Sequence, residues 1–126
     1  MKVNLKIIKS LHGHIGPYVV LGYVMGAYVR RHLSNIDKIT IYTKINPPVS
    51  CLLDGLQLST GCTLGKNKIK TIRKKEFEKA VFYKNKRIII IKLQSILEKM
   101  LKQSHRQALQ YIKKSNGKTL FKLIKN

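Results

Sequence analysis

Residues 47–66, PPVSCLLDGLQLSTGCTLGK, contain both cysteines of this 126-residue chain and one of its five acidic residues. Pro47 and Pro48 enforce an extended backbone and favour a helix that starts directly after them. From Val49 onward the apolar and small side chains recur every three or four residues, which predicts a short buried helix. Gly61 is suited to end this helix in a left-handed conformation.

This helix carries the residues with the most chemistry in the chain. Cys51 and Asp54 are three residues apart, so the helix directs a thiol and a carboxylate into the same small volume. Cys62 follows the helix end and returns near the start of the next predicted strand. The alternative is that both cysteines are simply small buried hydrophobic residues.

A second cluster, HGHIGP at residues 12–17, precedes an apolar helix that Pro17 is suited to begin. It places His12 and His14 two residues apart. In an extended segment their rings would point in opposite directions, so at most one is expected to share a site with the cysteine helix. The alternative role for these histidines is to cap the helix start.

The two clusters together suggest a metal site. His14 and Cys51 would be its first ligands, and Cys62 or His12 would complete it. Asp54 would act as a ligand or as an acceptor that orients a ring N–H. Zinc or another divalent transition metal tolerates such mixed ligands. The remaining histidines, His32 and His105, stand among basic residues and are assigned no role.

The order and content of these motifs resemble the FwdE/FmdE family, named for the E component of formylmethanofuran dehydrogenase. The matching residues are His12-Gly13-His14-x-Gly16-Pro17, Leu21-Gly22-Tyr23-x-Met25-Gly26, and Cys51-x-x-Asp54-Gly55-x-Gln57-x-x-Thr60-Gly61-Cys62-Thr63-x-Gly65-Lys66. The chain departs from the family at Gly16, where members usually have a cysteine, and it has no C-terminal cysteine cluster that could form the added zinc finger of some members.

The resemblance implies one FwdE/FmdE-like domain over residues 1–126, with a metal site at the His and Cys motifs. It also implies a homodimer and a link to archaeal and anaerobic bacterial one-carbon metabolism, including methanogenesis and molybdenum or tungsten enzymes. The chain has no dinucleotide fingerprint and no cluster-binding run of cysteines. We therefore expect an accessory protein or a non-catalytic subunit of an enzyme complex rather than a complete oxidoreductase.

The net charge suggests an alternative function. The chain has 26 Lys and Arg against five Asp and Glu, a formal charge of +21, so it should bind polyanions at least weakly. A basic nucleic-acid-associated or regulatory protein is thus the alternative, although we do not expect aromatic residues to be interleaved with the lysines as a stacking platform requires. Two cysteines beside histidines indicate a reducing cytoplasm. The apolar run at residues 15–29 is too short for a membrane span.

The periodicities predict an α+β domain, a small mixed or antiparallel sheet with helices packed on it, in the order α-β-α-β-β-β-α. The first ten residues could form a short strand or begin a helix. The predicted elements that follow are a helix from Pro17, a strand at 38–45, the cysteine helix, strands at 68–73, 80–83 and 87–92, and a helix at 93–115 that Ser104 could break. An apolar tail ends the chain.

Two finer expectations concern packing. Gly22 and Gly26, four residues apart, should leave a groove in which another helix, such as the cysteine helix, packs closely. The run of four isoleucines at residues 88–91 is typical of a strand that is covered on both faces.

Overall fold

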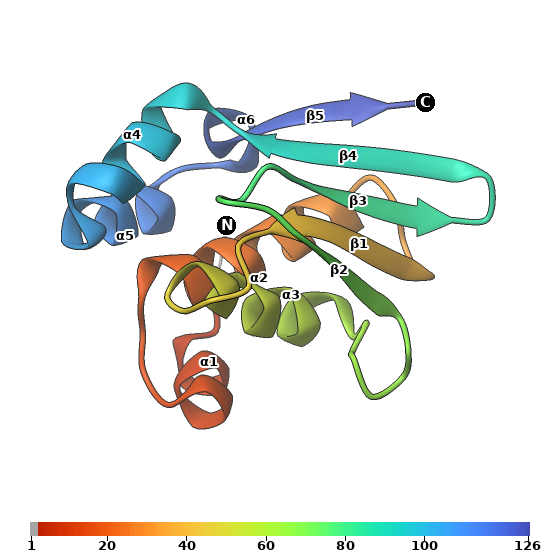
Figure 1. Cartoon of the computed structure of the whole chain (residues 1–126), viewed down its shortest axis with the longest axis horizontal. Helices are drawn as coiled ribbons and strands as arrows, with labels where there is room; N and C mark the ends of the chain where they lie inside the picture. The colour runs from red at the N-terminus through yellow and green to blue at the C-terminus, as the bar shows by residue number, and fades with distance from the viewer. Residues whose placement is uncertain (1–2) are drawn as a thin grey trace.

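The computed structural model describes residues 3–126 as a single α+β domain (Figure 1). The helices are α1 (Leu5–His12), α2 (Pro17–Arg30), α3 (Leu52–Thr60), α4 (Ser95–Gln103), α5 (His105–Lys114) and α6 (Gly117–Leu120), with a 3₁₀ turn, η1 (Val49–Cys51), before α3. The strands are β1 (Lys38–Thr43), β2 (Ile69–Arg73), β3 (Lys79–Lys84), β4 (Arg87–Leu93) and β5 (Phe121–Lys125). The predicted α+β class is therefore confirmed.

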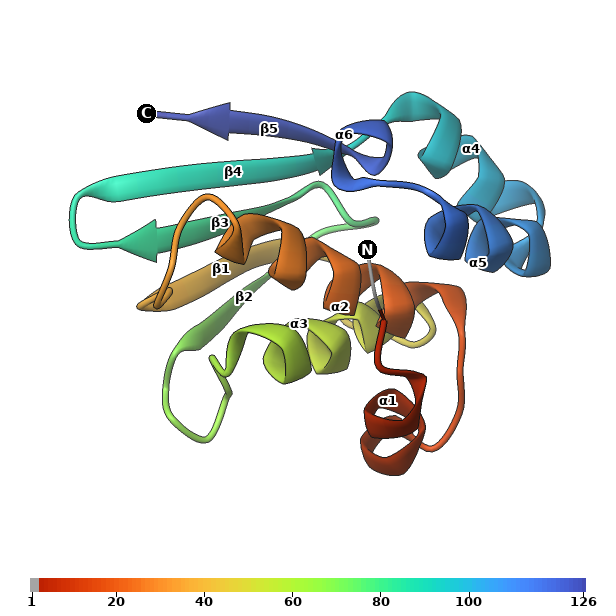
Figure 2. The ribbon, with the colours of Figure 1, turned by 180° about the vertical axis from the view of Figure 1, so that it is seen from behind.

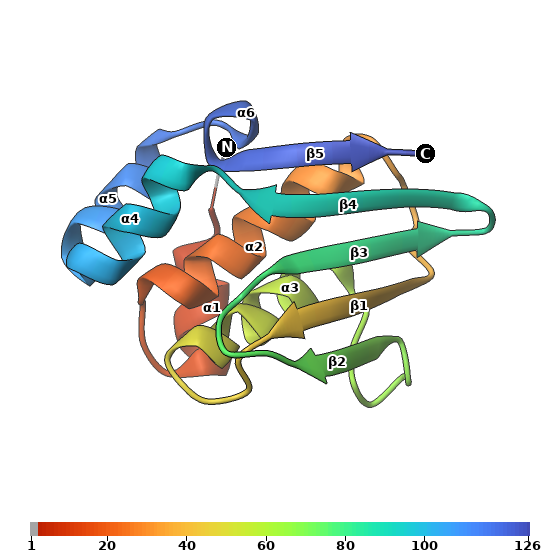
Figure 3. The same ribbon diagram turned by 45° about the horizontal axis from the view of Figure 1, so that its top comes forward.

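The five strands form one mixed sheet in the order β2-β1-β3-β4-β5. β1 and β2 run parallel, and the other neighbouring strands are antiparallel. Helices α2 and α3 cover one face, as the view from behind shows (Figure 2). Side chains such as Ile41, Phe82 and Ile91 point from that face into the core and are fully buried. α4 and α5 lie beside one end of the sheet (Figure 3).

Glycines set the distance between α2 and α3. A Cβ at Gly22 would lie 2.8 Å from the carbonyl carbon of Leu52, and a Cβ at Gly26 would lie 2.7 Å from Cγ2 of Thr60. These positions are filled by backbone and side chains of α3, so the predicted close packing of the cysteine helix in the glycine groove is confirmed. This packing holds the start of α3, next to Cys51, against α2.

Several predicted boundaries change. The first segment is the helix α1, whose N-cap Asn4 accepts a hydrogen bond from Ile7 N at 3.1 Å; residues 1–2 of that prediction lie outside the described part. Ser104 does break the long C-terminal helix, because its hydroxyl oxygen caps α5 by accepting from Gln107 N. The apolar tail is a fifth strand, β5, which pairs with β4.

The expectation that the isoleucine strand is covered on both faces is wrong. Ile89 and Ile91 face the core, whereas Ile88 and Ile90 are half-buried on the opposite face. No helix covers that second face anywhere in residues 3–126 (Figure 3). Among these residues, likewise, no helix is long and apolar enough to cross a membrane.

Candidate functional site

The two sequence motifs meet in a pocket of about 210 Å³. It lies where the end of α1 and the start of α2 face the η1 turn and the first residue of α5. Its lining residues are His12, His14, Gly16, Pro17, Tyr18, Val19, Pro48, Cys51 and His105. His12, His14 and Cys51 therefore line the same pocket.

Both histidines reach this pocket because the segment that holds them is not extended. His12 is the last residue of α1, and Gly13 then adopts a left-handed conformation with φ of 96°. The rings of His12 and His14 are 4.6 Å apart between centroids. The expectation that their side chains point in opposite directions is therefore wrong, since it assumed a strand.

Asp54 orients the ring of His12. The Nδ1–H of His12 donates to Oδ2 of Asp54 at 2.6 Å, across 42 residues of sequence. A carboxylate can only accept, so the proton of a neutral ring lies on Nδ1 and the lone pair on Nε2. The His12 side chain is 8% exposed, and Nε2 has no hydrogen-bond partner within the described structure. Such an orphaned buried nitrogen costs about 1–3 kcal/mol.

His14 is exposed and stands next to an open position. A Cβ at Gly16 would lie 3.5 Å from Nε2 of His14, an ordinary contact distance. Gly16 has an extended backbone, with φ of −130°, which any residue can adopt. The absence of a side chain at position 16 therefore leaves room beside the imidazole.

Cys51 contributes a half-buried thiol at the end of η1. Burial raises the pKa of this thiol, and the nearby carboxylate of Asp54 raises it further. Without a cation beside it, the sulfur therefore stays protonated and unreactive at neutral pH.

The structure does not bring Cys62 to this pocket. Cys62 follows the opposite end of α3, about 14 Å along the helix axis from its start. Its buried thiol donates to the carbonyl oxygen of Ile36 at 3.3 Å, and burial raises its pKa. Cys62 thus behaves as the small buried residue of the alternative interpretation. Its predicted place among the ligands has no geometric support.

No sequence motif pointed to His105. This exposed histidine begins α5 and lies edge-on to Tyr18, with ring centroids 5.7 Å apart. It is 91 residues from His14, so no motif spacing could connect them. Only the packing of α5 against α2 adds a third imidazole to the pocket wall.

The potential metal ligands line the same pocket, but they are not arranged as a metal site. Among residues 3–126 no three His, Cys, Asp or Glu side chains stand close enough together to hold a metal ion. His14 and Cys51 would have to turn about their side-chain bonds to approach Nε2 of His12. Their exposed and half-buried positions leave room for such rotation.

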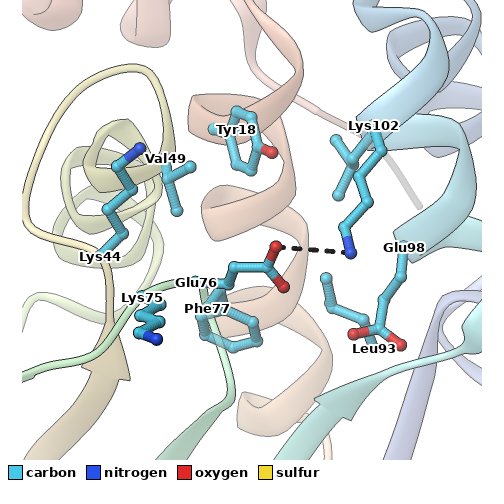
Figure 4. Close-up of a pocket in the computed structure, with 10 residues that line it drawn as sticks. Tyr18, Lys44, Val49, Lys75, Glu76, Phe77, Leu93, Glu98 and Lys102 are labelled. Carbon is cyan, nitrogen blue, oxygen red and sulfur yellow. Dashed lines mark ion pairs between the residues drawn. The ribbon is translucent and has the colours of Figure 1, made fainter.

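A second pocket, of about 170 Å³, shares Tyr18 with the first (Figure 4). Val49, Phe77, Leu93 and Leu101 form its apolar part, and lysines and glutamates surround it. Lys102 Nζ lies 3.4 Å from Glu76 Oε1, an exposed ion pair that contributes little stability. Burial raises the pKa of the Tyr18 hydroxyl, and the charge of Glu76 adds to the effect. Tyr18 is thus the common wall of two pockets.

Comparisons with known proteins agree with the sequence resemblance. Residues 11–123 match the family model described as "FmdE, Molybdenum formylmethanofuran dehydrogenase operon". The crystal structure of a tungsten formylmethanofuran dehydrogenase FmdE-like protein from Syntrophus aciditrophicus superposes with a TM-score of 0.68 at 20% identity, covering 97% of this chain and 69% of that one. A "Probable S-adenosyl-L-methionine-binding protein" of Archaeoglobus fulgidus is 38% identical over 69 residues, 48% of this chain. The alignment spans only 18% of that relative.

Proposed function

We propose that this chain, which belongs to the FmdE family, is an accessory protein that binds a divalent transition metal at the pocket of His12, His14 and Cys51. The family links the chain to the proteins of the formylmethanofuran dehydrogenase operon. In this role it would serve an enzyme complex of one-carbon metabolism in the cytoplasm, as a homodimer. The resident ion we propose is zinc or a similar metal.

The observation that carries this proposal is the orphaned Nε2 of His12. A carboxylate that holds one ring nitrogen of a pocket-lining histidine, while the other ring nitrogen has no partner, is the arrangement in which proteins present histidine to a metal. A metal bound at Nε2 would give this buried ring nitrogen of His12 the partner that it lacks among the described residues.

The remaining donors fit the same class of ion. His14 and His105 offer imidazole nitrogens, and Cys51 offers sulfur, which are the ligands zinc prefers. The raised pKa of the Cys51 thiol is no obstacle, because a coordinating metal stabilises the thiolate. When bound with an open position, such a metal supplies Lewis acidity to a ligand or water. The pocket beyond Tyr18 would accept the apolar part of an organic ligand.

The test compares the two cysteines. Protein purified without added metal is analysed for metal content and then titrated with zinc, using wild type, Cys51→Ser and Cys62→Ser. We expect about one ion per wild-type chain, a loss of at least tenfold in affinity for Cys51→Ser, and wild-type affinity for Cys62→Ser. A wild type that binds no ion, or equal losses in both variants, would contradict the proposal.

A further prediction uses the space beside His14. Gly16→Cys should raise zinc affinity by tenfold or more, because the new sulfur would lie next to Nε2 of His14 and its backbone is already extended. Competition with a chromogenic chelator measures the change. Gly16→Ser is the matched control, since it fills the same space with a weaker ligand. Equal affinities for both variants would show that position 16 does not face the metal.

A further inference from the structure

The face of the sheet that no helix covers has a defined composition, which the strand register gives. Side chains alternate between the two faces of each strand, and the residues opposite the core-facing ones form this open face. They are Lys70 and Ile72 of β2, Lys38, Thr40 and Tyr42 of β1, Lys79, Val81 and Tyr83 of β3, Ile88, Ile90 and Lys92 of β4, and Lys122 and Ile124 of β5. Together these residues are named the open face.

The open face is positively charged without compensation on the sheet. None of the five strands contains an acidic residue. Lysines stand on every strand of this face, from Lys70 at one edge to Lys122 at the other. The face therefore complements a polyanion rather than another basic surface, such as a second copy of this chain.

Two tyrosines, Tyr42 and Tyr83, lie on the central strands among these lysines, so the expectation that aromatic residues are not interleaved with the lysines is wrong for this face. Lys79 Nζ lies 4.7 Å from the ring centroid of Tyr42, and Lys38 Nζ lies 4.9 Å from that of Tyr83. In each pair the two residues are direct partners across β1 and β3. The tyrosines are half-buried, and about 13 Å separates them along the strands, so they would contact different groups of a bound chain.

Between and beside the rings the side chains are mostly apolar. Thr40 and Val81 fill the space between the tyrosines and are themselves buried, and Ile90 and Ile124 extend the same row toward β5. Ile124 is 47% exposed. Aromatic rings on an apolar floor, surrounded by flexible cations, suit a ligand with flat faces and a charged backbone.

From this arrangement we propose that the open face binds single-stranded nucleic acid. Tyr42 and Tyr83 stack on unpaired bases, and Lys38 and Lys79 move from the rings to neighbouring phosphates. In a duplex the faces of the bases are stacked on one another and cannot contact the tyrosines, so a duplex would contact only the lysines. Stacking accepts any base, so the binding is tolerant of sequence. This surface is separate from the His12 pocket.

The experiment measures binding by fluorescence anisotropy with labelled 16-nucleotide dT and U oligomers and a duplex of equal length, in a metal chelator and at 150 mM salt. Wild type should bind the single strands more tightly than the duplex. Tyr42→Leu and Tyr83→Leu should each weaken single-strand binding roughly tenfold and leave duplex binding within about twofold.

A double lysine variant tests the role of charge on the open face. Lys38→Ala with Lys79→Ala should weaken binding and reduce its salt dependence by about 0.7 in the log–log slope for each phosphate that the protein no longer neutralises. The matched control, with the same loss of charge on exposed positions of α5, is Lys113→Ala with Lys114→Ala, which should do neither. Equal effects of the two lysine pairs, or equal affinity of wild type for duplex and single strand, would overturn the proposal. So would a change in sedimentation of the tyrosine variants, which would identify the open face as an interface between copies.

Discussion

Gly55→Ala is expected to destabilise the protein by about 3 kcal/mol or more, the upper end of the cost of overpacking. A Cβ at Gly55 would lie within 2.5 Å of Tyr23 N and would also meet Val19 O. Both are backbone atoms of α2, which cannot rotate away. In an exposed helix the same change would stabilise by about 1 kcal/mol, so the sign of the effect reports the close packing. The melting temperature should fall by roughly 10 °C.

Gly65→Ala is the control for this experiment. A Cβ at Gly65 would meet only Thr63 Oγ1, at 4.0 Å, and the residue is exposed. Its free energy of unfolding should stay within about 0.5 kcal/mol of wild type. If thermal unfolding finds Gly55→Ala as stable as Gly65→Ala, α2 and α3 do not pack as described.

His12→Ala is expected to abolish zinc binding by the purified protein. The change removes a pocket-lining ring whose buried Nε2 has no hydrogen-bond partner among the described residues. It also leaves Asp54 without the ring that its carboxylate holds. Isothermal titration with zinc measures the loss. His32→Ala is the matched control, because His32 lies beside Tyr28, near the opposite end of α2, and does not line the pocket.

Asp54→Asn should weaken zinc binding without abolishing it. Loss of the carboxylate that orients a ligating histidine lowers metal affinity by about 10–100-fold. Asp37→Asn should have no effect, since Asp37 accepts from Asn85 N in a remote turn. Zinc affinity that is unchanged in His12→Ala would remove the central support for the proposed metal site.

Local sequence patterns predicted most of the helices and strands, and the packing of α2 on α3, correctly. The glycines of α2 predicted the close helix packing, and the alternation from Lys38 onward predicted β1. Pro17 begins α2, and Gly61 ends α3 with φ of 76°. Each of these signals depends on the conformational range or the size of one residue, so it can be interpreted without knowing the fold.

The failures have a common origin. The isoleucine run at 88–91 has the composition of a doubly covered strand, yet nothing in its own sequence tells whether a second layer packs there. The two lysine–tyrosine contacts of the open face, Lys38 with Tyr83 and Lys79 with Tyr42, join residues far apart in sequence that meet only through the pairing of β1 with β3. His105 lines the pocket because α5 packs on α2. Cys62 does not line it, because Cys62 follows the end of α3 opposite to Cys51.

The sequence by itself determined the family and the α+β class, and it predicted that His14 and Cys51 share a pocket. The tertiary structure decided which nitrogen of His12 is held by Asp54, which cysteine faces the pocket, and which face of the sheet stays open. The reason is physical: residue type and spacing act over a few positions along the chain, whereas hydrogen bonds and contacts between distant segments depend on how whole helices and strands pack.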